Sequence, residues 1–156
     1  MILFQDNFLN DSEIKFILDK WDESIKTFSN YAVNFFSVNL LNVDLSKIHN
    51  GNFSKVKFEK IRLQKYDDTF TQTDEYHGHE NIHNYILFLN DGFEGGELEF
   101  ENGLIVKPKK GALIYFNNNE RHRVHPCKGD RFVLTFLGNE KVELNLKTQK
   151  TSNTLI

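Results

Sequence analysis

The chain has 156 residues, of which 39% are hydrophobic and 26% charged, a composition typical of one soluble globular domain. The formal net charge is −3 and no basic block stands out, so nucleic acid is not expected as a partner. A single cysteine, Cys127, excludes an internal disulfide. Without a signal peptide or a membrane span in the sequence, we expect a cytoplasmic protein.

The N-terminal segment 10–28, "NDSEIKFILDKWDESIKTF", predicts a helix with Asp11 or Ser12 as its cap. Its apolar residues recur at helical spacing: Ile14, Ile17, Leu18 and Trp21. Residues 31–41 favour a strand, and residues 42–50, "NVDLSKIHN", indicate a second short helix. The alternation of "SKVKFEKIRLQKY" (54–66) predicts another strand.

From residue 83 onward, short apolar segments alternate with turn signals such as "DGFEGG", "ENG" and "KGD". At least six strands at this spacing indicate a sandwich or barrel. We therefore predict a mainly β protein with N-terminal helices. A single domain would span residues 1–156, with a helical part at about 1–30 and a β core at about 55–138.

Two polar side chains near the C-terminal end of this core indicate a pocket. His122 stands on one predicted strand, and Arg131 and Thr135 share one face of the next. A hairpin of these strands would place His122 beside Arg131, and such a pair is stable when an anion joins them. The alternative is a surface Arg131 that pairs with Asp130 or Glu120.

Five short motifs occur in a fixed order along the second half of the chain: "FLND", "FEGGE", "KPKKG", "HRVHP" and "GDR". In this order they resemble the 2-oxoglutarate and Fe(II)-dependent dioxygenases, in the prolyl 4-hydroxylase-like branch. The opening segment "DNFLNDSEIKFILDKW" is similar to the first helix of that branch. The resemblance extends from about Phe4 to Gly138 and implies a double-stranded β-helix, or jelly-roll, core.

The resemblance also implies a cofactor set and residue roles. The cofactors would be Fe(II), held by two histidines and one carboxylate, and 2-oxoglutarate as cosubstrate, with ascorbate as a candidate reductant. His122 matches the distal histidine ligand, and Arg131 matches the residue that binds the far carboxylate of 2-oxoglutarate. Thr135 would line the same pocket. An aromatic hydroxyl expected at Phe88 is missing, and two candidates could replace it: Tyr66 and Tyr115.

The first ligand pair of the family, His-x-Asp, falls on Gln72-Thr73-Asp74 of "QTDEYHGHE". Asp74 would be the carboxylate ligand, whereas Gln72 replaces a histidine and is a weaker ligand for Fe(II). Three interpretations follow. His77 supplies the missing imidazole; or His77, His79 and His122 form a three-histidine site like that of cupin dioxygenases; or the site is degenerate and the protein binds without oxidising.

The resemblance implies an enzyme that hydroxylates a C–H bond. The expected substrate is a prolyl or other peptidyl side chain, or a small molecule, and fold-level analogy alone supports the peptide. No membrane partner is expected. The alternatives are a three-histidine cupin-type dioxygenase and a catalytically inactive jelly-roll binding protein.

Overall fold

The computed structural model describes residues 1–30, 34–70 and 75–146, and within them a large antiparallel sheet faces a layer of two smaller antiparallel sheets. The large sheet has seven strands, in the spatial order β1 (Ile2–Gln5), β9 (Leu113–Asn117), β5 (His83–Phe88), β12 (Arg131–Gly138), β4 (Lys60–Tyr66), β3 (Asn34–Asn39) and β2 (Thr27–Asn30). The opposing layer consists of β10 (His122–Val124), β7 (Leu98–Phe100) and β8 (Ile105–Val106), together with the pair β11 (Cys127–Lys128) and β6 (Glu94–Gly95). The prediction of a mainly β, jelly-roll fold is confirmed.

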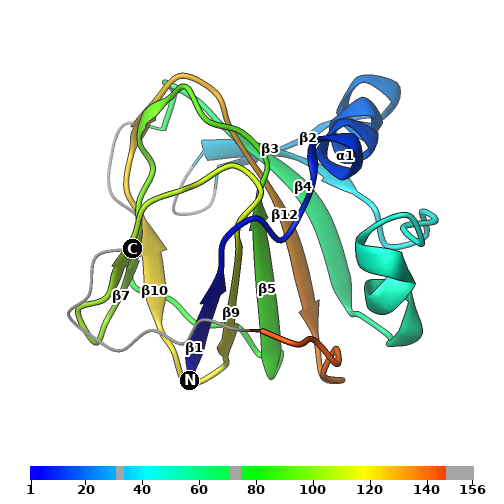
Figure 1. Ribbon diagram of the computed structural model, residues 1–156. Helices are drawn as coiled ribbons and strands as arrows, with labels where there is room; N and C mark the ends of the chain where they lie inside the picture. The colour runs from blue at the N-terminus through cyan, green and yellow to red at the C-terminus, as the bar shows by residue number, and fades with distance from the viewer. Residues whose placement is uncertain (31–33, 71–74, 147–156) are drawn as a thin grey trace.

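The large sheet is covered on both faces (Figure 1). Helix α1 (Asp11–Glu23) and the 3-10 helix η1 (His49–Lys55) cover one face, and the small strands cover the other. Along β12, Leu134 and Phe136 join the core beneath the helices, whereas Val133 joins the core between the sheets. Burial on two sides explains why the central strands are continuous apolar runs rather than alternating ones.

Helix α1 begins with a capping box at Asn10, one or two residues before the predicted caps Asp11 and Ser12. The Asn10 side chain accepts a hydrogen bond from the Glu13 amide at 2.8 Å, and the Glu13 carboxylate accepts one from the Asn10 amide at 2.9 Å. This reciprocal pair satisfies two amides that would otherwise lack partners. The buried Ile14 and Ile17 then attach the helix to the large sheet.

Other expectations need correction. The segment 1–30, expected to be helical, also contributes β1 and β2 to the large sheet. The predicted helix at 42–50 is absent, and the 3-10 helix η1 lies slightly later, interrupted by positive φ values at Asn50 and Gly51. Asn and Gly adopt this conformation at low cost, which breaks a regular helix. The strand favoured for 31–41 is found in part as β3, Asn34–Asn39, and residues 31–33 lie outside the described residues.

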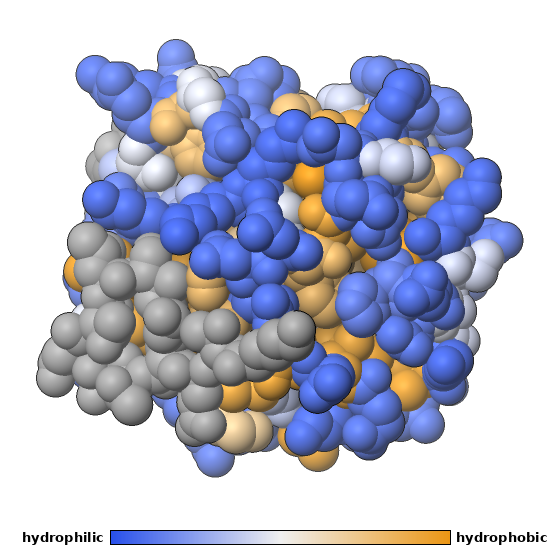
Figure 2. All heavy atoms as spheres, viewed as in Figure 1, coloured by the Kyte–Doolittle hydropathy of each residue, from blue (hydrophilic) through white to orange (hydrophobic). Residues whose placement is uncertain are grey.

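The face of the molecule in Figure 2 is mostly hydrophilic, with strips of hydrophobic residues between the polar groups. Among the described residues, no helix has the length and apolar character that a membrane span requires.

Candidate functional site

Three histidines from two separate segments come together between the sheets. His77 and His122 face each other through two backbone hydrogen bonds, in which the amide of each donates to the carbonyl of the other at 2.9 Å. His79 follows two residues after His77, and its Nε2 lies 3.2 Å from the Nε2 of His122. The ligand nitrogens of His77, His79 and His122 all lie within 4.8 Å of one another.

The electrostatics of this cluster suit a metal ion. Burial, and then repulsion from the other two rings, lowers the pKa of His122 to about 3. Burial, and then His77, lowers the pKa of His79 to about 4. These two rings are therefore neutral at pH 7, and a neutral imidazole offers the lone pair that a metal needs.

Backbone carbonyls fix the orientation of two of the rings. The Nδ1 of His122 lies 3.2 Å from the Glu120 carbonyl, and the Nδ1 of His77 lies 3.0 Å from the Glu75 carbonyl. With Nδ1–H donating to the Glu120 carbonyl, the Nε2 of His122 keeps its lone pair for the cluster. Two nitrogens at right angles around one ion, each about 2.1 Å from it, are about 3 Å apart, close to the observed His79–His122 separation.

A buried cation lies on the opposite wall, at the start of β12. Arg131 is 2% exposed, and its guanidinium lies 4.9 Å from the Tyr66 ring and 5.8 Å from the Phe88 ring. Its Nε donates to the Gly96 carbonyl at 3.0 Å, and none of the described acidic side chains forms an ion pair with it. Burial lowers the pKa of Arg131. A buried cation with no described counter-ion is able to bind an anion.

The glycine pair of "FEGGE" is explained by the same guanidinium. Gly96 has a φ of +74°, and a Cβ at this position would lie 2.8 Å from the Cδ of Arg131 and 3.0 Å from its Nε. Any larger residue would displace the Arg131 side chain. The surface pairing considered for Arg131 is wrong, since Asp130 pairs with Lys65 and Glu120 with the N-terminus.

The histidines and the arginine share one cavity of about 530 Å³, a size typical of small-molecule sites. Tyr66 and Thr135 line it as well, and Thr135 donates a hydrogen bond to Gln64 at 2.8 Å. The structure thus brings together the predicted residues His77, His79, His122, Arg131, Tyr66 and Thr135.

Other predicted features differ or lie elsewhere. Strands β10 and β12 belong to different sheets, so His122 and Arg131 meet across the cavity and not within a hairpin. The Tyr115 hydroxyl lies 2.7 Å from the Nδ1 of His83, in the core beneath the helices, and does not line the cavity. Gln72 and Asp74 lie outside the described residues.

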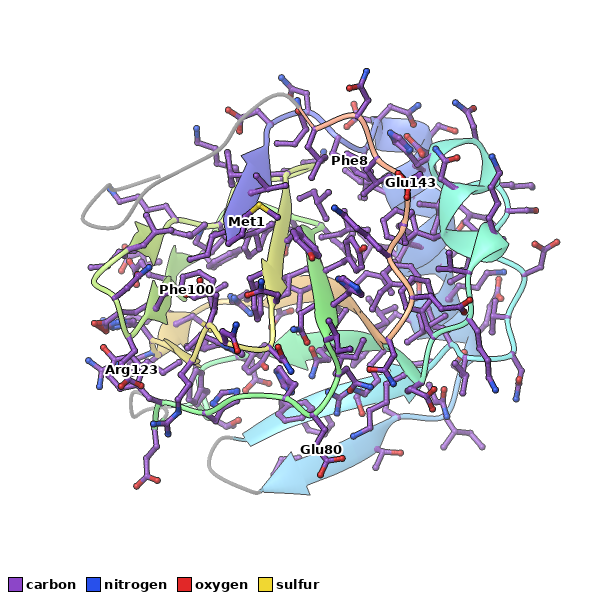
Figure 3. The ribbon with its side chains drawn as sticks, turned by 90° about the horizontal axis from the view of Figure 1, so that it is seen from below. Met1, Phe8, Glu80, Phe100, Arg123 and Glu143 are labelled. Atoms are coloured by element: carbon purple, nitrogen blue, oxygen red, sulfur yellow. The ribbon has the colours of Figure 1, made fainter. Side chains whose placement is uncertain are left out.

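A polar network that the sequence analysis missed supports the segment with His77. Glu99 on β7 accepts hydrogen bonds from Arg123 and Tyr76 at 2.8 Å, and from His125 at 2.9 Å. The Arg123 guanidinium also lies 4.2 Å from the Tyr76 ring centre. Figure 3 shows Arg123 on the small-sheet side of the molecule, away from Phe8. Glu99 and Arg123 face each other across β7 and β10, so this ion pair could be inferred only from the pairing of the two strands.

This network predicts a pH-dependent contribution to stability. The hydrogen bond from Arg123, with those from Tyr76 and His125, lowers the pKa of Glu99 from 4.5 to about 2. A lowered pKa means that the stabilisation is complete above about pH 4.5 and is lost as the pH falls towards 2. We expect Glu99→Gln to lower the free energy of unfolding at pH 7, with the difference from wild type shrinking over that acid range.

Urea unfolding at a series of pH values measures this difference. The control is Glu101→Gln, because Glu101 forms an exposed ion pair with Arg121 at 3.3 Å that should contribute little. A Glu99→Gln deficit that stays constant down to pH 2 would contradict the assigned pKa.

Comparisons with known proteins agree with this geometry. A family model described as the 2OG-Fe(II) oxygenase superfamily matches residues 52–137, more than half of the chain. None of the curated proteins matches the chain in sequence.

Three solved structures share the fold. An oxidoreductase of the 2OG-Fe(II) oxygenase family from Burkholderia pseudomallei is 11% identical, with a TM-score of 0.70 over 90% of this chain and 88% of that one. A prolyl-4-hydroxylase from Pseudomonas putida is 16% identical, with a TM-score of 0.65 over 90% and 93%. A Trichoplax adhaerens prolyl hydroxylase, in complex with a peptide fragment of the hypoxia inducible factor oxygen degradation domain, is 15% identical, with a TM-score of 0.65 over 87% and 82%.

Proposed function

The chain belongs to the 2OG-Fe(II) oxygenase superfamily, and from this premise we propose that it is an Fe(II)-dependent oxygenase with 2-oxoglutarate as its cosubstrate. One observation carries the proposal. A cluster of three histidine nitrogens and a buried Arg131, which has no ion pair with a described carboxylate, line the same cavity. The cluster suits a divalent metal and the arginine suits a carboxylate, which are the two parts that this chemistry requires.

For the metal, we propose His77, His79 and His122 as ligands. This choice follows the second of the three interpretations, and the proximity of the three nitrogens supports it. Asp74 stays a prediction for a carboxylate ligand, and Gln72 an alternative, because both lie outside the described residues. The rings of His79 and His122 are already neutral at pH 7. No proton therefore has to be released before they bind a metal.

For the cosubstrate, Arg131 would bind the far carboxylate of 2-oxoglutarate, with Tyr66 and Thr135 along the wall between. Iron and 2-oxoglutarate, when bound, would supply the activation of dioxygen for oxidation of a C–H bond. Residues of this chain hold both in one orientation, and the apolar walls, among them Ile86 and Val133, keep water away.

A peptidyl side chain such as proline is a candidate substrate. The similarity in fold to two prolyl hydroxylases, one of them solved with a peptide fragment, supports it. A cupin-type dioxygenase that uses three histidines without 2-oxoglutarate is the second candidate, supported by the three-histidine cluster. The buried Arg131 favours the first mechanism, since a cosubstrate with two carboxylates gives this cation a partner.

Addition of Fe(II) and 2-oxoglutarate without oxygen tests the proposal. We expect the visible charge-transfer band of the iron chelate in the wild-type protein, and no band with Fe(II) alone. Protein whose iron binds but whose spectrum does not respond to 2-oxoglutarate would support the cupin-type alternative. Absence of iron binding by folded protein would indicate the degenerate, non-catalytic interpretation.

A further inference from the structure

A second cation lines the cavity at a place that the cosubstrate does not explain. Strand β4 presents Lys60, Arg62, Gln64 and Tyr66 to the cavity, since alternate residues of a strand share one face. Lys60 is exposed, Arg62 is half-buried, and Gln64 and Tyr66 are buried. This row therefore leads from solvent into the cavity, with Arg62 at the transition.

Arg62 lacks the partners that a desolvated guanidinium needs. Its Nε is buried and has no hydrogen-bond partner within the part of the chain that the structure describes. No ion pair joins a described carboxylate to Arg62 or to Lys60. Burial lowers the pKa of Arg62, although a guanidinium stays charged at pH 7. An unpaired, partly desolvated cation of this kind is costly unless a ligand satisfies it.

Arg62 and Arg131 serve different ends of the cavity. Arg131 is the β12 partner of Tyr66, whereas Arg62 is the partner of Thr135, four residues further along. At roughly 3.3 Å per residue, these two positions on β12 are about 13 Å apart. Arg62 and Lys60 line the same cavity as the three histidines of the cluster.

We propose that Arg62, assisted by Lys60, binds a carboxylate of the molecule that the enzyme oxidises, and that the substrate is therefore an acid. This inference rests on the proposed function for the identity of the metal site. Arg131 already binds the far carboxylate of 2-oxoglutarate in the proposed function. Arg62 is therefore left to bind a carboxylate of the substrate. Because Arg62 and the histidine cluster line one cavity, the substrate carboxylate and the C–H bond to be oxidised would lie in that same cavity.

The carboxylate can be the α-carboxylate of a small amino acid or an acidic side chain of a peptide. Calorimetry on protein loaded with Fe(II) and 2-oxoglutarate without oxygen distinguishes the two sources. The probes are acetyl-L-leucine against its amide, and a capped Ala-Glu-Ala tripeptide against capped Ala-Gln-Ala. We expect one acid to bind at least tenfold more tightly than its amide, since a charge-assisted hydrogen bond is lost in the amide.

Arg62→Gln should abolish that preference, and Arg62→Lys should keep part of it. The matched control is Lys65→Gln, because Lys65 stands on the same strand but outside the cavity, paired with Asp130 at 3.6 Å. The Fe(II)–2-oxoglutarate band should form equally in wild type, Arg62→Gln and Lys65→Gln.

Three results would overturn the inference: amides that bind as well as the acids, acids that do not bind at millimolar concentration, or a preference that survives Arg62→Gln. A band that is weakened by Arg62→Gln as strongly as by Arg131→Gln would also overturn it, since Arg62 would then belong to the cosubstrate site. Absence of the band in wild type counts against the proposed function. The preference for acids over amides is measured independently, by calorimetry and not by turnover.

Discussion

His122→Ala should reduce Fe(II) affinity by more than a hundredfold while leaving the protein folded. His122 is 3% exposed, and its Nε2 lies 3.2 Å from that of His79, at the centre of the cluster. Removal of a residue that merely supports a ligand typically costs ten- to a hundredfold in metal affinity, and removal of a ligand costs more. Competition with a chromophoric chelator, together with the far-UV circular dichroism spectrum, measures both properties.

The control for this experiment is His125→Ala. His125 stands three residues further along the chain, bonds to Glu99 and does not line the cavity, so iron affinity should change little. Three further variants, His77→Ala, His79→Ala and Asp74→Ala, identify the remaining ligands. A loss in both His77→Ala and His79→Ala supports the three-histidine set, and an equal loss in Asp74→Ala adds a carboxylate. Iron binding that survives His122→Ala would exclude the cluster as the metal site.

Strand periodicity made much of the fold predictable. The strand predicted for 54–66 is found only from Lys60, as β4, since Ser54 and Lys55 belong to η1. The apolar runs after residue 83 correspond to β5, β9 and β12, because local patterning and burial agree there. The small strands β6, β8 and β11 have only two residues each, too few to show a period. The contribution of β1 to the large sheet depends on pairing with β9 more than a hundred residues later, which no local pattern encodes.

The candidate site shows the same limit. Arg131 and Thr135 were predicted to share one face of a strand, because alternate residues point to the same side, and both line the cavity. The proximity of His77 to His122 depends on a backbone pairing between distant segments, so the sequence left several ligand sets open. Arg62 was missed because a cation among lysines on an alternating strand resembles a solvated face. Its role became visible only when the opposite sheet enclosed that face.

Arg131→Gln should weaken 2-oxoglutarate binding by about a hundredfold, or ~2.7 kcal/mol, and leave Fe(II) affinity nearly unchanged. The physical reason is that Arg131 is buried without a described counter-ion and lines the cavity from β12, on another wall than the histidines. The free energy of unfolding should not fall, because the variant removes an uncompensated buried charge. Titration of the charge-transfer band and urea unfolding measure the two effects, and an equal loss of iron and 2-oxoglutarate binding would indicate a structural role.

Gly96→Ala is a second variant, which keeps the positive charge of Arg131 but changes the position of its guanidinium. The added methyl group would lie 2.8 Å from the Cδ of Arg131, so the guanidinium must shift away from its position beside Tyr66. Gly92→Ala is the matched control, since Gly92 has a φ of +88° with no atom within 4 Å of the added carbon. Both variants carry backbone strain at positive φ, but only Gly96→Ala should weaken 2-oxoglutarate binding. Equal affinities in the two variants would mean that the position of the Arg131 guanidinium does not affect binding of the cosubstrate.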